Sequence, residues 1–377
     1  MSTPRHTVVR RAPGKLFVAG EYAVVEPGNP AILVAVDRYV TVTASPRTGG
    51  GAGGADVVIS SDLAPGPVGW RWHGQRLVLH GPGDGQRARG ALAHVLSAIE
   101  VVGSLGAERG LPAPALEVSV SSQLHQEGRK FGLGSSGAVT VATVAAVGSW
   151  CAMDLSPDDR FRLAMLATAR LDAKASGGDL AASTWGGWIA YQAPDRAHVL
   201  DLAHRLGVGT ALRAPWPGHR VSRLSPPEGL SLQVGWTGEP ASTASLVSAL
   251  HRGTWRGTAS HGRFVRTTTA CVRAAAAALR TGDRQGLLHQ IRLARRELAR
   301  LDDKVGLGIF TPGLRTMCDA AEAVGGAAKP SGAGGGDCGI ALLDAGAPRD
   351  ITHVRERWAT AGVLPLPVRP ALEGTEQ

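Results

Sequence analysis

Strand-like alternation of hydrophobic and polar residues opens the chain and returns at intervals through its first half. Residues 6–27 and 31–45 combine a period of two with many β-branched residues, which is the pattern of half-buried strands. Residues 116–124 repeat the pattern, and residues 69–81 carry a weaker form of it. A further strand is predicted at residues 183–192. The first half of the chain therefore predicts a sheet of several strands.

Helical patterns follow these strands and dominate the second half. Residues 90–103 are amphipathic, and the apolar run at residues 139–153 predicts a buried core helix, too short and too interrupted to span a membrane. The next helix has clear start signals, with Ser156 as N-cap, Pro157 at the first helical position and two acids in the first turn. In the second half, strands are expected at residues 230–236 and 338–344, and helices at residues 241–251, 264–279, 284–301, 312–323 and 351–361.

Residues 211–229 separate the two halves, because they are rich in proline and lack any period. A chain of 377 residues is long enough for two domains. We therefore expect an N-terminal domain at residues 1–210, a linker at residues 211–229 and a C-terminal domain at residues 230–377. Since both halves mix strands with helices, the expected fold class is α+β.

Composition narrows the range of partners. The formal net charge of +9 favours acidic partners such as small phosphorylated molecules, but no basic block with interleaved aromatic residues suggests a nucleic acid. The first residues lack the apolar stretch of a secretory signal, and no membrane partner is expected. Four cysteines without metal-binding spacing predict reduced thiols in a cytoplasmic protein, and these are Cys151, Cys271, Cys318 and Cys338.

The most informative stretch is the glycine- and serine-rich sequence at residues 130–137, directly before the apolar run. Its glycines satisfy G-x-G-x-x-G, but the residues before Asp154 do not form the second strand that a dinucleotide-binding fold requires. An anion cradle fits better, because glycines let backbone N–H groups approach a phosphate and the helix N-terminus adds its positive end. On this stretch alone, a flexible turn before a helix remains an open alternative.

Other stretches also carry groups suited to phosphate chemistry. Five glycines lie between Gly332 and Gly339 and lead into a strand. That composition is costly for a plain hairpin, whereas close backbone approach to a ligand would explain it. Asp179 lies in an expected small-residue loop, where it is a candidate general base, and Lys15 lies near the start of a strand-like segment. Taken singly, Asp179 is better explained as a turn or cap residue and Lys15 as a solvated lysine.

Taken together and in this order, these stretches resemble the GHMP kinase superfamily. Its three signatures are matched at residues 12–25, 132–136 and 329–337, so the resemblance covers essentially the whole chain. Within the superfamily, the details are similar to the phosphomevalonate kinases. Tyr22 stands where mevalonate kinases usually carry His, and Gly137 stands where the more general pattern has Ala.

The resemblance implies a two-domain α+β fold with an atypical βαβ N-terminal domain, a ferredoxin-like C-terminal domain and an active site between them. It implies Mg²⁺-ATP as phosphoryl donor and 5-phosphomevalonate as acceptor, within isoprenoid synthesis by the mevalonate route, in a monomer or homodimer. The alternatives are another small-molecule kinase, such as a mevalonate kinase, and a non-catalytic member of the fold that only binds a ligand.

The matched motifs imply roles for individual residues at the donor. Ser136 is the expected Mg²⁺ ligand, with Ser135 as the alternate. The residues expected to bind the ATP phosphates are Lys130, Gly132, Leu133, Gly134, Ser135, Ser136 and Gly137.

At the acceptor, the resemblance implies that Asp179 contacts the phosphate group and either orients it or takes its proton. Lys15 is expected to pair with Asp179 and to offset charge as the γ-phosphoryl group moves. The residues expected to line the acceptor site, with backbone N–H groups facing the substrate, are Ser331, Gly332 and Ala333.

Two further groups of side chains have an ordinary interpretation and a functional one. Trp70 and Trp72 are expected in the core, with contacts to the nucleotide base as the alternative. Four arginines on one face of the helix at residues 284–301 are expected to face solvent, with binding of the substrate's anionic groups as the alternative, and these are Arg292, Arg295, Arg296 and Arg300.

Overall fold

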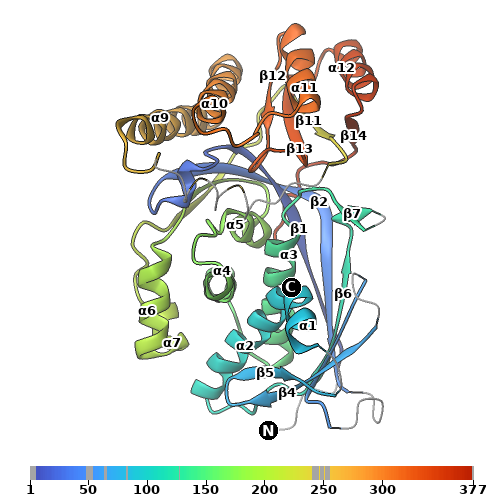
Figure 1. The fold of residues 1–377 in the computed structure, drawn as a ribbon, viewed down its shortest axis with the longest axis vertical. Helices are drawn as coiled ribbons and strands as arrows, with labels where there is room; N and C mark the ends of the chain where they lie inside the picture. Colours follow the sequence, from blue (N-terminus) through green and yellow to red (C-terminus); the bar gives the residue numbers. More distant parts are fainter. Residues whose placement is uncertain are drawn as a thin grey trace.

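The computed structural model describes residues 6–47, 54–62, 66–81, 84–126, 128–239, 246, 250 and 255–375. Most of the helix expected at residues 241–251 lies outside these ranges. The described chain is mixed α+β, as expected, and it forms a large sheet with helices and a smaller sheet with its own helices (Figure 1).

The large sheet has eight strands in the order β10-β9-β2-β6-β3-β4-β5, with β1 paired to β2. Its pairs are antiparallel except for β3 and β6, which run parallel. A register shift between Pro13 and Gly14 interrupts the long β1–β2 pairing beside the Gly14-Lys15 pair of the first motif. The strands are β1 (Val8–Ala19), β2 (Pro30–Ser45), β3 (Val57–Ser61), β4 (Val68–His73), β5 (Arg76–Leu79), β6 (Leu116–Ser122), β9 (Trp188–Gln192) and β10 (Arg220–Leu224).

Helices of the first half pack on one face of this sheet, and a buried apolar core lies between the two layers (Figure 1). The helix expected after Ser156 begins at Pro157, and Ser156 and Asp159 form a complete capping box. The helices are α1 (Gly85–Ala91), α2 (Ala93–Glu108), α3 (Ser135–Trp150), α4 (Pro157–Leu171), α5 (Gly178–Trp185), α6 (Arg196–Leu206), α7 (Val208–Arg213) and the short 3₁₀ helix η1 (Ala23–Val25).

The second half builds a four-stranded antiparallel sheet in the order β12-β13-β11-β14. Helices α9 and α10 pack against each other beside it, and α11 and α12 complete a second apolar core (Figure 1). These elements are β11 (Leu230–Trp236), β12 (Ala327–Pro330), β13 (Cys338–Asp344), β14 (Leu364–Leu366), α9 (Ala259–Thr281), α10 (Arg284–Val305), α11 (Pro312–Ala323) and α12 (Pro348–Thr360).

Three local features differ from the expectations. The strand expected at residues 183–192 begins only at Trp188, because α5 runs to Trp185 and the left-handed residues Gly186 and Gly187 separate the two. The expected linker at residues 211–229 contains the end of α7 and strand β10, which pairs with β9 at the edge of the large sheet. Two small β-strands, β7 (His125–Gln126) and β8 (Arg129–Lys130), occupy the polar stretch before the second motif.

The C-terminal residues return to the first half of the molecule. Pro370 forms a β-bridge with Val36, and the N–H of Ala371 donates to the carbonyl of Ala35 at 2.9 Å. The C-terminal residues are therefore tied to the middle of β2, next to the place where Gly14 and Lys15 of β1 pair with it. Within the described ranges, no single helix is long and apolar enough to cross a membrane, although α1 and α2, bent by 87°, reach that length and composition jointly.

Candidate active site

The second motif forms a tight turn that leads into α3. Gly132 and Gly134 adopt left-handed backbone conformations with φ of 77° and 78°, and Gly134 is the N-cap of the helix. Among the described residues no side chain caps α3, and no acid lies in its first turn, so the N–H groups at its start remain available to an anion. The turn is fixed to β1, because the carbonyl of Leu133 accepts from the N–H of Lys15 at 2.8 Å.

Lys15 and Asp179 converge on this turn from two sides. A Cβ atom placed on Gly134 would lie 2.8 Å from Cε of Lys15 and 3.4 Å from Cβ of Asp179. A Cβ atom placed on Gly137 would lie only 2.5 Å from Oδ2 of Asp179. Both glycines therefore leave space that functional side chains fill. The structure brings the first two motifs and the acid together at the N-terminus of α3.

Asp179 lies in the first turn of α5, not in the loop that its small neighbours suggested. Gly177 is left-handed with φ of 73° and starts this helix, so the acid is held by regular backbone. Its Oδ1 atom accepts from the N–H of Leu180 at 3.0 Å. The helix is fixed against β1, since a Cβ atom on Gly178 would lie 3.1 Å from the ring of Phe17.

The ion pair expected between Lys15 and Asp179 is not formed. Across the part of the chain that the structure describes, no ion pair within 4.0 Å joins them. The carboxylate is turned toward the first turn of α3, whereas the ammonium of Lys15 lies 5.4 Å from the ring centroid of Phe17. Lys15 is 8% exposed, so burial and packing hold its side chain while its charge stays available to a ligand.

The third motif forms the turn between β12 and β13. Its Ser331 is buried, and its hydroxyl accepts from the N–H of Phe17 at 2.8 Å and donates to the carbonyl of Phe17 at 3.0 Å. The N–H of Ser331 donates to Cys338 within the sheet. The hydroxyl of Ser331 therefore anchors the turn to β1, and its N–H anchors it to Cys338 of β13. The expectation that Ser331 faces the acceptor is not supported by these contacts.

Gly332 and Ala333, the two residues after Ser331, are less constrained by hydrogen bonds than Ser331 is. Gly332 is left-handed with φ of 84°, and a Cβ atom placed on it would meet nothing within 4 Å. Among the described residues, the N–H groups of Gly332 and Ala333 have no hydrogen-bond partner. These two residues can therefore present backbone donors to an anion.

The second and third motifs also touch each other. A Cβ atom on Gly132 would lie 2.5 Å from Cβ of Asp337, and the thiol of Cys338 donates to the carbonyl of Phe131 at 2.9 Å. Burial raises the pKa of the Cys338 thiol, so it stays protonated and structural. All three motifs thus meet in one place, between the large sheet and the small one.

Several residues singled out in the sequence lie elsewhere. Lys130 is exposed on β8, and Trp70 is buried in the core at 1% exposure. Trp72 donates its indole N–H to the carbonyl of Pro114 at 2.8 Å. The tryptophans are therefore structural.

The arginines of α10 also make structural contacts. Arg292 donates to the carbonyls of Gly325 and Gly326, and Arg295 pairs with Asp319 and Glu322 on α11. Arg300 pairs with Glu297 one turn earlier, and Arg296 is exposed. Arg296 and Arg300 are exposed, as the ordinary interpretation predicted, whereas Arg292 and Arg295 contact neighbouring elements and do not simply face solvent.

His94 was not found by sequence reasoning, yet it lies beside the second motif. Its Nδ1 is 3.3 Å from the hydroxyl of Thr140, which donates its own hydrogen to the carbonyl of Ser136 at 2.7 Å. The imidazole Nδ1 must then carry the proton, which leaves Nε2 as an acceptor. Burial lowers the pKa of His94, the charge of Asp179 opposes that shift and the charge of Lys130 adds to it. No local signal marks His94, because it begins a helix far upstream of the loop.

The donor atoms at this place suit a magnesium ion that binds together with a nucleotide. Within the described ranges no group of three or more His, Cys, Asp or Glu side chains forms a ready-made metal site. Mg²⁺ needs few protein oxygens when phosphate oxygens complete its shell. Ser136 lies in the first turn of α3 and the carboxylate of Asp179 is turned toward the same turn, so these two side chains could supply protein oxygens to such an ion.

Comparisons with known proteins agree with this geometry. Family models match the GHMP kinases N terminal domain at residues 93–187 and the GHMP kinases C terminal domain at residues 275–360. The phosphomevalonate kinase of Streptomyces sp. (strain CL190) is 74% identical over 374 residues, covering 99% of this chain and 100% of that protein.

More distant relatives include both phosphomevalonate kinases and mevalonate kinases. A structure of Streptococcus pneumoniae phosphomevalonate kinase in complex with phosphomevalonate and AMPPNP is 27% identical, with a TM-score of 0.83 over 96% of this chain and 99% of that one. The mevalonate kinase of Thermococcus onnurineus (strain NA1) is also 27% identical, over 97% of each protein.

Proposed function

This chain belongs to the GHMP kinase family, and on that premise we propose that it transfers the γ-phosphoryl group of ATP to 5-phosphomevalonate. The product is 5-diphosphomevalonate, an intermediate of the mevalonate route to isoprenoids. The full-length identity of 74% to a phosphomevalonate kinase supports this acceptor over mevalonate, whose kinases match at 26–31%.

The observation that carries the mechanism is the convergence of three groups at Gly134. The side chains of Lys15 and Asp179 and the uncapped N-terminus of α3 surround that residue, and the carboxylate of Asp179 lies next to Gly137. Phosphoryl transfer requires positioning and charge stabilisation more than covalent chemistry by the protein. A cation, an oriented acid and a row of backbone donors supply both.

The donor's β- and γ-phosphates bind at the turn from Gly132 to Gly137. Left-handed glycines aim backbone N–H groups at the phosphates, and the end of the helix dipole adds partial positive charge. Ser136 supplies an oxygen to Mg²⁺, which lowers the charge repulsion between the phosphates and the acceptor when it is bound. Ser135 stays the alternate ligand. Lys130 contributes long-range positive charge only, because it is exposed.

A phosphate oxygen of the acceptor attacks the γ-phosphorus, and the bond from that phosphorus to the bridging oxygen of ADP breaks. The second pKa of a phosphate monoester is about 6, so the acceptor is already mostly dianionic at neutral pH. Asp179 therefore orients the acceptor and its attacking oxygen, and a strong base is not needed. Lys15 offsets the negative charge that moves between donor and acceptor.

The acceptor's own phosphate lies between Lys15 and the turn at Gly332 and Ala333. The open space at Gly332 and the free N–H groups of both residues support this placement. Ser331 acts indirectly, by holding the turn on β1 through Phe17.

A substrate panel tests the proposal. Purified protein with Mg-ATP is offered mevalonate, 5-phosphomevalonate or 5-diphosphomevalonate, and ADP release is followed by a coupled assay. We expect turnover with 5-phosphomevalonate alone. Turnover with mevalonate would make the protein a mevalonate kinase, and no turnover with any acceptor would favour a ligand-binding member of the fold.

We also propose that the protein works in the cytoplasm as a monomer or homodimer. The four cysteines, all within the described ranges, are unpaired, which suits a reducing compartment where ATP is available. Sedimentation of the purified protein at several concentrations distinguishes the two assembly states.

A further inference from the structure

The turn after β1, residues 20–26, lies where the two halves of the molecule meet, and we call it the first-motif turn. Gly20 has φ of 100°, and a Cβ atom there would lie 2.6 Å from the backbone of Ala31. Tyr22 has φ of 62°, an uncommon conformation for a residue with a large side chain. Such a conformation persists only where surrounding contacts hold it.

The first contact is a buried ion pair between the two halves. Lys329 on β12 is 0% exposed and Glu21 is 3% exposed, and the ammonium of Lys329 donates to Oε1 of Glu21. The same ammonium donates to the carbonyl of Pro330 at 2.7 Å. A buried ion pair adds little stability over apolar side chains of similar size, because both charges lose their water. A role other than stabilising the fold would therefore explain why a buried ion pair occupies this place.

The second contact is made by the neighbouring residue. The hydroxyl of Tyr22, which is buried, donates to the carbonyl of Ala333. Burial raises the pKa of this phenol, and the nearby carboxylates of Asp302 and Glu21 add to the shift, so it stays a donor at any physiological pH. The ion pair at Lys329, the bonds of Ser331 to Phe17 and the bond from Tyr22 to Ala333 together hold the third-motif turn at alternate residues.

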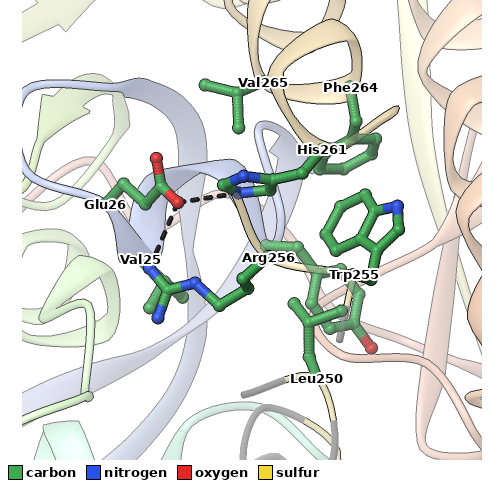
Figure 2. A pocket seen from close by; sticks show the side chains of 9 residues that line it. Val25, Glu26, Leu250, Trp255, Arg256, His261, Phe264 and Val265 are labelled. Carbon is green, nitrogen blue, oxygen red and sulfur yellow. Dashed lines mark hydrogen bonds and ion pairs between the residues drawn. The ribbon is translucent and has the colours of Figure 1, made fainter. Parts of the chain in front are cut away.

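The first-motif turn is itself anchored on its far side. Glu26 accepts from His261 at 2.8 Å and from Arg256 at 3.2 Å, both from the start of the α9 region (Figure 2). Leu250, Trp255 and other apolar side chains line the small cavity beside these ion pairs (Figure 2). Since α9 belongs to the second half, the first-motif turn is held by that half from two directions.

These anchors set where the free donors of the third motif lie. Phe17, to which Ser331 is bound, is two residues from Lys15 on β1, so their side chains share a face of the strand. The turn that carries the N–H groups of Gly332 and Ala333 is thereby fixed to the part of β1 that carries Lys15. We propose that Glu21, Tyr22 and Lys329 are positioning residues that hold the Gly332–Ala333 turn at the spacing from Lys15 that the acceptor's phosphate group requires.

This inference rests on the proposed function and is tested by kinetics with 5-phosphomevalonate and Mg-ATP. The variants are Glu21→Met, Lys329→Met and the double variant, which replaces the ion pair by apolar side chains of similar length. We expect the double variant to keep its Tm within about 3 °C, because the lost pair is replaced by apolar contacts. Its KM for 5-phosphomevalonate rises about tenfold while its KM for ATP changes less than about twofold.

If the Met variants fold poorly, a smaller substitution at Tyr22 tests the same positioning role. Tyr22→Phe removes one hydroxyl and keeps the ring, and we expect its kcat/KM for 5-phosphomevalonate to fall about tenfold. Ser97→Ala is the matched control, since the Ser97 hydroxyl is also buried and donates to a backbone carbonyl, that of Ala167 at 2.8 Å. Arg295→Met removes the two ion pairs that Arg295 of α10 makes with α11 and serves as the control for charge. Both controls should keep wild-type KM values.

The outcomes separate positioning from a purely structural role. Wild-type KM for the acceptor in the double variant and in Tyr22→Phe would overturn the proposal. So would a rise in both KM values that follows the loss of Tm. If the unmodified protein does not turn over 5-phosphomevalonate, the proposed function itself fails, which is a different result from unaffected variants of an active enzyme.

Discussion

Gly137→Ala tests the placement of Asp179 with one added methyl group. Gly137 lies in the first turn of α3, and its missing Cβ leaves the space that the Asp179 carboxylate occupies. The new Cβ would lie 2.5 Å from Oδ2, 2.6 Å from Cγ and 2.8 Å from Cβ of Asp179. Ordinary contacts between such atoms are about 3.5 Å or more, so the carboxylate must move by roughly 1 Å.

The expected loss follows from that displacement. A misplacement of about 1 Å at a reacting group can cost up to about a hundredfold in rate, so we expect kcat to fall between about tenfold and a hundredfold. Alanine in a helix is favoured over glycine by up to about 1 kcal/mol, which offsets part of the about 1–3 kcal/mol that the added close contact costs, so the loss of stability should be small. The two effects together distinguish a displaced acid from a damaged fold.

The assay is steady-state ADP release with 5-phosphomevalonate, combined with thermal unfolding. Gly90→Ala is the control, because Gly90 is also helical and a Cβ atom there would meet nothing within 4 Å. It should keep wild-type kinetics. A folded Gly137→Ala protein with wild-type kcat would show that the observed position of the Asp179 carboxylate is not needed for catalysis.

Other predictions concern the metal, the acid and pH. Asp179→Asn should lower kcat by about two orders of magnitude while the KM for ATP stays near wild type, and unchanged kcat would remove Asp179 from the mechanism. Ser136→Ala should raise the KM for Mg-ATP and weaken the response to Mg²⁺, so a wild-type Mg²⁺ titration would contradict the metal assignment. Burial lowers the pKa of His219, which stacks on Phe161 at a centroid distance of 4.7 Å. The unfolded chain therefore binds the proton at higher pH than the folded one, and stability should fall as pH drops below about 6.5. Thermal unfolding from pH 7 to 5 should show a smaller decrease in Tm for His219→Phe, and equal decreases would exclude this contribution.

Elements with strong local signals were predicted well. Helix α11 spans residues 312–323 as expected, and α4 begins after Ser156 with the predicted cap and proline. Strand β6 matches the alternating pattern at residues 116–124. Capping, periodicity and proline act within a few residues, so the sequence carries the necessary information.

Elements that depend on distant partners were predicted poorly. Strand β10 looks like part of a linker, because it is an edge strand with few buried side chains and proline-rich flanks. Its pairing with β9 decides its structure. The helix that carries Asp179 is likewise short and packed on β1, and its small residues alone suggested a loop.

The order of three short motifs along the chain was enough to indicate the family, because each motif needs particular residue types for phosphate chemistry. The direction of each side chain was decided only by tertiary contacts. Ser331 is bound to Phe17, 314 positions away in sequence, and Asp179 is turned toward Gly137 and away from Lys15. Such contacts join segments that no local pattern relates, so composition and spacing predicted which groups the site contains, and packing determined which of them remain free to act.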